Sequence, residues 1–390
     1  MPVKLLVVDD EPDLELLVRQ RFRKQIRAGD YAVEFARSGV EALQKLAAMP
    51  DIDIVLTDIN MPEMDGLTLL VKLQELDRLL KAVIVSAYGD MDNIRTAMHR
   101  GAADFLTKPI DFRDMELTVA KTLKELEALR HATREHDQLL ALRHELQIAS
   151  VIQQSILPRH FPPFPERTDL DVFAAMLPAR EVGGDFYDFF LLDHDHLGVV
   201  VGDVSGKGVP AAIFMAMSRT LLKSSALQGM TPADCLGHVN ALLCLDNAAE
   251  MFVTIFYGIL DTRSGQLAYS NGGHNPPYVV RHGGTLERLP ATGGMVLGVF
   301  DDVAYGNATA TLEPGDAVFL YSDGITEAMD RADGLFSEAR LCTVLNAAAA
   351  RDPRSLVDHV VAAVQTHAGD VPQSDDITAL CIRWPAAVRP

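Results

Sequence analysis

Short apolar runs alternate with segments of helical periodicity over the first 120 residues. The apolar runs predict five β-strands, at Lys4–Val8, Ala32–Ala36, Ile52–Thr57, Ala82–Ser86 and Asp104–Leu106. The intervening segments predict helices near 13–27, 39–48, 66–77, 91–100 and from 112 onward. Because strands and helices alternate, the pattern is typical of a parallel sheet covered by helices and predicts a doubly wound α/β fold with flavodoxin-like strand order.

Residues 112–157 contain no glycine or proline and predict one long helix. Two groups of apolar residues follow coiled-coil spacing and are separated by a polar stretch: Val119, Leu123 and Leu126, and then Leu139, Leu142, Leu146 and Ala149. A single solvated helix is one interpretation. We favour a parallel dimer helix, because a lone helix would leave two leucine stripes exposed. The helix must end by Ile156–Leu157, since Pro158 disfavours helical geometry in the preceding residue.

Strand-like runs dominate from about residue 169 to 385, with helical patterns at 209–227, 232–247, 337–349 and 354–367. The runs lie at Val172–Ala175, Phe189–Leu192, Leu197–Gly202, Phe252–Leu260, Gln266–Ser270, Tyr278–Arg281, Ala317–Tyr321 and Ala379–Arg383. Such grouping predicts an α+β or layered sandwich domain. We therefore expect three parts: a domain at 1–125, a helical linker at 126–157 and a second domain at 158–390.

Composition and charge narrow the class of protein. The formal charge of −19 argues against a nucleic-acid-binding output domain. No apolar run approaches the roughly 18 residues that span a bilayer, and the N-terminus runs directly into a strand without a signal peptide. Four widely spaced cysteines without a CxxC pair favour reduced core thiols. We expect a cytoplasmic protein that binds neither nucleic acid nor membrane.

Aspartates stand at the ends of many predicted strands, beside small residues. The first domain has Asp9, Asp10 and Asp58, and the second has Asp185, Asp203, Asp323 and Asp375. Any one of them alone is more often a turn residue or a helix N-cap. Carboxylates gathered at strand ends make sites for hard divalent cations, which prefer oxygen ligands. The sequence therefore predicts two acidic sites.

The first 125 residues resemble response-regulator receiver domains. The resemblance rests on Asp9-Asp10 after the first strand, Asp58 after the third, Ser86 after the fourth and Lys108-Pro109 after the fifth. It implies that Asp58 is the nucleophile that accepts a phosphoryl group. Asp9 and Asp10 would hold Mg²⁺ together with Asp58 and the backbone carbonyl of Asn60, while Lys108 and Ser86 would contact the phosphate. Phe105 would be the aromatic switch residue, or simply a core or edge aromatic.

The second half resembles the SpoIIE and RsbU branch of the metal-dependent serine/threonine phosphatases (protein phosphatase 2C, or PPM, family). Six segments match in order: ELQIASVIQQSILP, EVGGDFYDFF, GDVSGKGVPAAIFMA, NGGHNPP, FLYSDGITEA and SDDITALCI. The resemblance implies a β-sandwich flanked by helices. GDVSGKG is not a phosphate-binding P-loop, because Gly208 stands where serine or threonine should follow the lysine.

The same resemblance implies roles for the aspartates. Asp185 and Asp203 would bind two Mn²⁺ or Mg²⁺ ions, with Asp203 bridging them beside the carbonyl of Val204. Asp323 and Asp375 would complete the second ion's shell, although Asp376 could replace Asp375. Two such ions can lower the pKa of a bridging water for direct attack on phosphorus. For Lys207 a solvated loop position and for His274 a structural role are the favoured interpretations.

The leading hypothesis is a two-component response regulator whose output is a phosphoserine/phosphothreonine protein phosphatase. A sensor histidine kinase or phosphotransfer protein would phosphorylate Asp58, and the long helix of a homodimer would carry the signal. The branch resemblance implies a STAS-type anti-sigma-factor antagonist as the substrate. The alternative is an adaptor that has weak activity or none and binds a regulatory partner. All four metal aspartates are present, which disfavours the adaptor.

Overall fold

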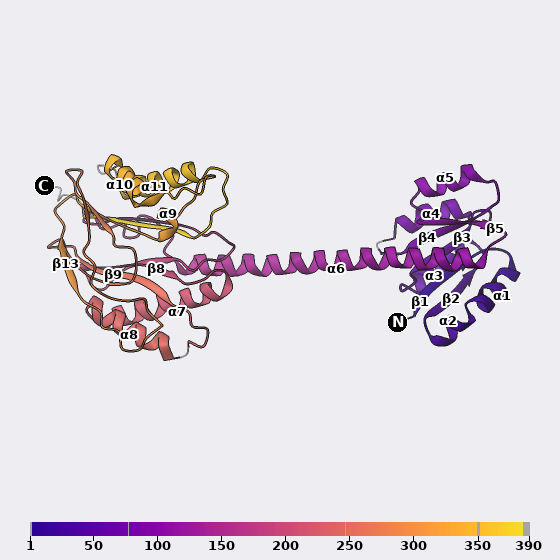
Figure 1. The fold of residues 1–390 in the computed structure, drawn as a ribbon, viewed down its shortest axis with the longest axis horizontal. Coiled ribbons are helices and arrows are strands. Elements are labelled where there is room, and N and C mark those ends of the chain that lie inside the picture. The colour runs from indigo at the N-terminus through magenta and orange to yellow at the C-terminus, as the bar shows by residue number, and fades with distance from the viewer. Residues whose placement is uncertain (1, 77, 246, 349–351, 385–390) are drawn as a thin grey trace. The chain divides into compact units, whose positions relative to one another are not determined.

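The computed structural model describes residues 2–76, 78–245, 247–348 and 352–384 (Figure 1). The predicted helices that reach residues 77 and 349 and that cross residue 246 extend there beyond the described part of the chain. The chain divides into two compact units, Met1–Leu142 and Arg143–Pro390. Among the described residues, no helix is both long enough and apolar enough to cross a membrane.

The first unit is built on a parallel five-stranded sheet of order β2-β1-β3-β4-β5. This order confirms the predicted flavodoxin-like fold. β3 and most of β1 and β4 are buried because helices cover both sheet faces. The strands are β1 (Val3–Val8), β2 (Tyr31–Ala36), β3 (Ile54–Asp58), β4 (Lys81–Ala87) and β5 (Asp104–Lys108). The helices before the linker are α1 (Pro12–Arg21), α2 (Arg23–Ala28), α3 (Gly39–Ala48), α4 (Gly66–Gln74) and α5 (Met91–His99).

The helix predicted near 13–27 is two helices, which was not expected. Phe22 separates α1 from α2 with φ −85° and ψ 12°, a backbone conformation outside the α-helical range. Its side chain is 1% exposed and lies against Tyr31, with ring centroids 5.5 Å apart. Burial of this ring in the core accompanies the break, which no glycine or proline marks in the sequence.

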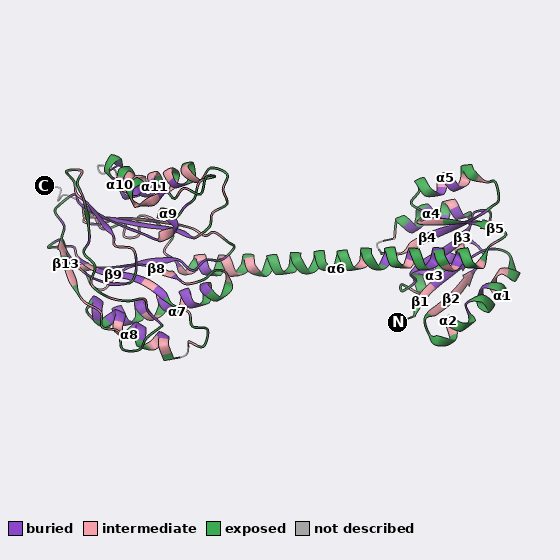
Figure 2. Cartoon of the chain, viewed as in Figure 1, coloured by how far each residue is buried: buried purple, intermediate pink, exposed green. Residues whose placement is uncertain are grey.

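The predicted long helix is α6 (Phe112–Ile156), but the first part of its predicted dimer seam is wrong. Val119 and Leu126 are fully buried and Leu123 is partly buried, and Val119 and Leu123 belong to the hydrophobic core of the first unit. They therefore cover the parallel sheet rather than a second chain. Every residue from 131 to 145 is exposed (Figure 2). Leu139 and Leu142 remain free for a partner helix, so the dimer stays a prediction.

The second unit contains two five-stranded sheets, of order β13-β10-β9-β8-β7 and β12-β11-β14-β15-β6. Neighbouring strands are antiparallel in both sheets. The first comprises β7 (Phe186–Leu191), β8 (His196–Val204), β9 (Val253–Asp261), β10 (Gln266–Gly272) and β13 (Ala308–Thr311). The second comprises β6 (Asp171–Leu177), β11 (Tyr278–Val280), β12 (Leu286–Arg288), β14 (Ala317–Tyr321) and β15 (Ile377–Arg383).

Helices cover the outer faces of the two sheets, which confirms the predicted sandwich (Figure 1). α7 (Val209–Ala226) and α8 (Pro232–Leu245) pack on the first sheet, and α9 (Asp323–Thr326), α10 (Ser337–Ala348) and α11 (Pro353–Ala368) lie on the side of the second. Buried side chains of both sheets form the layer between them. β12, β13 and the single turn α9 were not predicted, because β12 and β13 are short edge strands without a buried apolar run.

Candidate active site

Three aspartates meet at one edge of the parallel sheet. Asp9 and Asp10 follow β1, Asp58 ends β3, and these two strands are neighbours. One carboxylate oxygen from each lies within 4.8 Å of the others, the only such group of three among the described residues. Asp9 and Asp58 are buried and Asp10 is exposed. The set has the charge and geometry to hold one divalent cation open to solvent.

Lys108 closes this acidic site from the end of β5. Its ammonium nitrogen lies 2.8 Å from Asp58 Oδ2 and 3.0 Å from Asp9 Oδ2. Partial burial lowers the pKa of Lys108, but the hydrogen bonds to Asp58 and Asp9 outweigh it and keep that pKa above its usual range. Ser86 is fully buried on β4, next to β3 in the sheet, and its hydroxyl donates to Asp90 Oδ2 at 3.3 Å.

The structure places the two remaining predicted residues of this unit near the same edge but exposed. Asn60 lies in the loop two residues after Asp58. Phe105 is 36% exposed on the edge strand β5. An outward-facing aromatic on an edge strand leaves room for the predicted inward rotation, which remains a prediction.

The four aspartates of the second unit lie in two pairs, one at the edge of each sheet. β7 and β8 pair with Phe186 opposite Gly202, which brings the residues just before and after them, Asp185 and Asp203, side by side. In the other sheet β14 and β15 pair, and the backbone N–H of Ser322 donates to Thr378. Asp323 directly follows Ser322, and Asp375 lies three residues before Thr378.

The charges of these aspartates raise one another's pKa. Burial and then the charge of Asp203 raise the pKa of Asp185, while burial and then the charge of Asp323 raise the pKa of Asp203 to about 7. The pKa of Asp323 is raised by its own burial and then by Glu327 and Asp375. Asp185 Oδ2 is buried and accepts no hydrogen bond within the described chain. Mutually repelling carboxylates with an unpaired oxygen fit a metal centre, because a cation relieves both deficits.

The loop after Asp203 depends on glycine. Gly206 and Gly208 have φ of +82° and +78°, in the left-handed region that side chains disfavour. The turn carries Lys207, whose ammonium nitrogen lies 3.0 Å from Asp375 Oδ2 and also donates to the Ser374 carbonyl. Lys207 is therefore paired with a predicted metal ligand and is not simply solvated.

Asp375 and Asp376 differ sharply in their surroundings. The Asp375 side chain is 37% exposed, whereas Asp376 is 7% exposed. The carboxylate of Asp376 accepts backbone N–H groups from Ala179 at 2.8 Å, Gly184 at 2.7 Å and Asp185 at 3.3 Å. Asp376 is thus fully engaged with the backbone that leads into β7.

His274 is buried behind the aspartates. Its ring nitrogens contact the Thr254 hydroxyl at 2.8 Å and the Tyr321 carbonyl at 3.1 Å, so Nε2 carries the proton and Nδ1 accepts. Asn271 bonds both the N–H and the C=O of His274. Burial lowers the pKa of His274 to about 4, with the bond to Tyr321 opposing it. A neutral imidazole that links three chain segments supports a structural role.

This buried imidazole predicts a pH dependence of stability. The folded pKa, about 4, lies below the ordinary value of 6.5, so the unfolded chain takes up the proton first as the pH falls. The contribution of neutral His274 to the free energy of unfolding is therefore complete above pH 6.5 and is lost as the pH falls towards 4. Between pH 7 and pH 5 the wild type should lose about 2 kcal/mol more than His274→Gln. Urea unfolding of both proteins in EDTA measures this difference, and equal losses would contradict the assignment.

Family models match a part of each unit. The response-regulator receiver domain model matches residues 5–120, and the Stage II sporulation protein E (SpoIIE) model matches residues 193–385. The chain is 36% identical over 125 residues to the chemotaxis protein CheY of Treponema pallidum, covering 32% of this chain and 84% of that protein. It is 33% identical over 201 residues to the phosphoserine phosphatase RsbU of Bacillus subtilis, covering 50% of this chain and 58% of RsbU.

This chain joins a receiver domain to a SpoIIE-family domain. The receiver match lies within the first unit and the SpoIIE match within the second, and we call these units the receiver and the SpoIIE domain. The protein IcfG of Synechocystis is 31% identical over 267 residues, which are 62% of this chain and 41% of IcfG. The chain thus spans only about half the length of these two phosphatase-side relatives, IcfG and RsbU.

A solved structure supports the fold of the SpoIIE domain. The SiaA-PP2C domain of Pseudomonas aeruginosa superposes with a TM-score of 0.57 at 26% identity. The match covers 63% of this chain and 98% of that domain. It therefore extends over the whole sandwich that carries Asp185, Asp203, Asp323 and Asp375.

Sequence reasoning missed a contact between α6 and the SpoIIE site. Gln153 is 6% exposed, and its side-chain amide donates to the Gly183 carbonyl at 2.6 Å and accepts the Gly183 N–H at 3.1 Å. Gly183 lies two residues before Asp185. The signal was a polar residue on the otherwise apolar face of ELQIASVIQQSILP, which is unusual unless both amide groups are paired.

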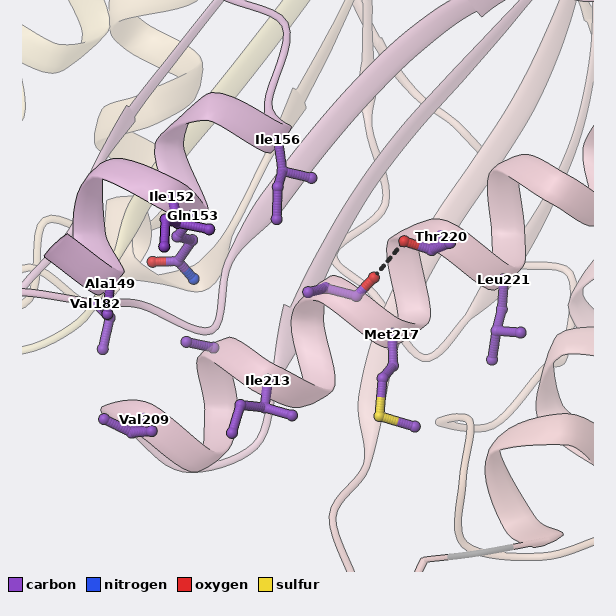
Figure 3. Close-up of a pocket in the computed structure, with 12 residues that line it drawn as sticks. Ala149, Ile152, Gln153, Ile156, Val182, Val209, Ile213, Met217, Thr220 and Leu221 are labelled. Atoms are coloured by element: carbon purple, nitrogen blue, oxygen red, sulfur yellow. Dashed lines mark hydrogen bonds between the residues drawn. The ribbon is translucent and has the colours of Figure 1, made fainter. Parts of the chain in front are cut away.

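An apolar groove of about 610 Å³ lies beside this contact, between the end of α6 and α7 (Figure 3). Ile152 and Ile156 line it from α6, and Val209, Ile213 and Met217 line it from α7. Gln153 supplies the main polar group on the α6 side. α6 is therefore fastened to the SpoIIE domain at the aspartate-bearing loop rather than by continuous packing along α7.

Proposed function

We propose that this chain is a two-component response regulator whose output is a metal-dependent phosphoserine/phosphothreonine protein phosphatase. The observation that carries the proposal is the set of aspartates beside paired strands of the two sheets, Asp185 and Asp203 in one and Asp323 and Asp375 in the other. Supporting the proposal, the charge of Asp203 raises the pKa of Asp185, the charge of Asp323 raises the pKa of Asp203, and Asp185 Oδ2 has no hydrogen-bond partner among the described residues. The similarity to RsbU, a phosphoserine phosphatase, supports the reaction class.

The donor set fits two hard divalent ions. Asp185, Asp203 and the Val204 carbonyl would hold Mn²⁺ or Mg²⁺ on the first sheet, and Asp323 with Asp375 would complete the second position. The Val204 carbonyl faces the same loop, since a Cβ on Gly184 would lie 2.8 Å from it. When bound, two such ions supply a water of lowered pKa and neutralise the phosphoryl oxygens. The chain itself would hold the four carboxylates at the strand ends of the two sheets.

The receiver would supply the input. Asp58 is the proposed phosphoryl acceptor, with Mg²⁺ held by Asp9, Asp10, Asp58 and the Asn60 carbonyl. Lys108 already bonds Asp58 and Asp9 and would turn to the phosphoryl oxygens once Asp58 is modified. A histidine kinase or phosphotransfer protein would act as donor, in keeping with the receiver family.

The proposed substrate is a small phosphoprotein, an anti-sigma-factor antagonist of the STAS type. Support for this comes from the SpoIIE family match and from the likeness to RsbU. We also propose that the protein works in the cytoplasm as a homodimer through the exposed part of α6, where Leu139 and Leu142 are about half exposed.

One assay tests the phosphatase. The full chain should release inorganic phosphate from a phosphoserine protein only when Mn²⁺ or Mg²⁺ is added, and EDTA should stop the release. A chain that binds the phosphoprotein but releases no phosphate with either ion would instead be an adaptor. That outcome would overturn the enzymatic proposal.

We propose that α6 transmits the state of the receiver through Gln153. Replacing Gln153 by leucine removes both hydrogen bonds to Gly183. The buried N–H and C=O of Gly183 are then unpaired, which lowers the free energy of unfolding by roughly 2 kcal/mol. The aspartate-bearing loop should loosen, and the phosphatase rate should fall about tenfold or more.

The matched control is Gln154→Leu, because the hydrogen bond of Gln154 within the described residues runs to Ser150 on its own helix, at 3.4 Å. Steady-state phosphate release from both variants at saturating Mn²⁺ measures the effect. Equal rates for Gln153→Leu and Gln154→Leu would show that the contact does not serve catalysis.

A further inference from the structure

One carboxylate ties the two sheets of the SpoIIE domain together at the acidic edge. Asp376 immediately precedes β15 of the second sheet. Its Oδ1 accepts the N–H of Ala179, and its Oδ2 accepts those of Gly184 and Asp185. Gly184 and Asp185 lead directly into β7 of the first sheet. A side chain of one sheet therefore fixes the backbone that carries Asp185 on the other.

The backbone of Asp376 makes the matching contact on its own sheet. Its carbonyl accepts the Ser322 hydroxyl at 3.2 Å, and the same hydroxyl accepts the Thr378 N–H at 3.0 Å. Gly324 packs so closely that a Cβ there would lie 2.0 Å from the Asp376 carbonyl oxygen. Asp376 thus touches the segments on both sides of Asp323 as well as the segment of Asp185.

We infer that Asp376 is a positioning residue that sets the distance between the Asp185–Asp203 pair and the Asp323–Asp375 pair. This role rests on the proposed function only in that those pairs hold metal. A two-ion site needs its two halves at a fixed separation, since the ions act together when roughly 3.5–4 Å apart. Here each half belongs to a different sheet, and Asp376 spans them.

The same geometry assigns the neighbouring Asp375, not Asp376, to the metal. A cation at Asp376 would have to displace three backbone N–H groups and leave them buried without partners. Asp375 instead offers a partly exposed carboxylate whose partners are its neighbour's N–H, at 2.9 Å, and the partly exposed ammonium of Lys207, at 3.0 Å. Gly183 also packs closely against the Asp376 carboxylate, because a Cβ there would lie 2.1 Å from Asp376 Oδ2.

The test compares Asp376→Asn with Asp375→Asn in the full chain. Asparagine at 376 turns an amide NH₂ toward backbone N–H groups, so the melting temperature in EDTA should fall by about 5 °C. Mn²⁺ affinity, measured by calorimetry, should fall about 10–100-fold, as for residues that orient metal ligands, without loss of stoichiometry. Asp375→Asn should keep the wild-type melting temperature in EDTA and bind one Mn²⁺ fewer.

The opposite pattern would overturn the inference: an unchanged melting temperature for Asp376→Asn together with one ion lost. If that variant does not fold, Gly183→Ala, which crowds the same carboxylate from the other side, must weaken Mn²⁺ affinity similarly, and wild-type affinity in it would also overturn the inference. Absence of Mn²⁺ binding by the wild type would count against the proposed function instead, while the melting temperature in EDTA would still report the contact between the sheets.

Discussion

Replacing Asp203 by asparagine should lower phosphate release by at least about 1000-fold. Asp203 lies beside Asp185 at the end of β8, and its pKa is raised to about 7 by burial and by the charge of Asp323. Its carboxylate is the group proposed to contact both ions, so its loss should remove the paired charge stabilisation. That stabilisation amounts to several kcal/mol, and each 1.4 kcal/mol changes a rate tenfold.

The measurement is phosphate release from a phosphoserine protein at saturating Mn²⁺, accompanied by calorimetric Mn²⁺ binding. Asp193→Asn is a suitable control, because Asp193 lies in the β7–β8 turn at the other end of the same strands. A variant Asp203→Asn with more than a tenth of the wild-type rate would remove Asp203 from the proposed centre.

Replacing Asp58 by asparagine should abolish phosphorylation of the receiver. An amide cannot form the acyl phosphate, and Asp58 is the proposed acceptor at the end of β3, 2.8 Å from the ammonium of Lys108. Incubation with acetyl phosphate and Mg²⁺, followed by intact-protein mass measurement, should show one added phosphoryl group on the wild type and none on the variant.

The same experiment also measures the phosphatase activity of both proteins. Phosphate release by the wild type should change when acetyl phosphate is added, and release by Asp58→Asn should not. Asp92→Asn, on the exposed first turn of α5, should behave as wild type in both readouts. Phosphoryl incorporation into Asp58→Asn at the wild-type level would place the acceptor elsewhere.

The fold could be predicted where a local pattern decides the structure. Parallel strands buried on both faces leave long apolar runs, so the strands of the receiver were placed within about two residues. The break at Phe22 could not be foreseen, because no glycine or proline marks it and the burial of the ring that accompanies it is a tertiary contact. The prediction that Val119 and Leu126 lie in a dimer seam was wrong for a similar reason. Coiled-coil spacing also suits a helix that packs on the sheet of its own domain.

The candidate site was predictable as a set of residues but not as an arrangement. The order of the sequence motifs identified the four aspartates, because each motif places its aspartate at the end of a predicted strand. The choice between Asp375 and Asp376 required three-dimensional contacts, since adjacent residues with identical side chains carry the same local signal. Gln153 was missed because its partner is a backbone group 30 residues away, which no side-chain motif records.

The bare stretch of α6 from residue 131 to 145 has a thermodynamic consequence. Its side chains are all exposed, so its helical state depends on its own backbone bonds and local ion pairs such as His131 with Glu135. Isolated helices of about 15 residues are only marginally stable in water. In a single chain, without the proposed partner helix, the receiver and the SpoIIE domain should therefore unfold as separate units, with the fastest amide exchange of α6 between them.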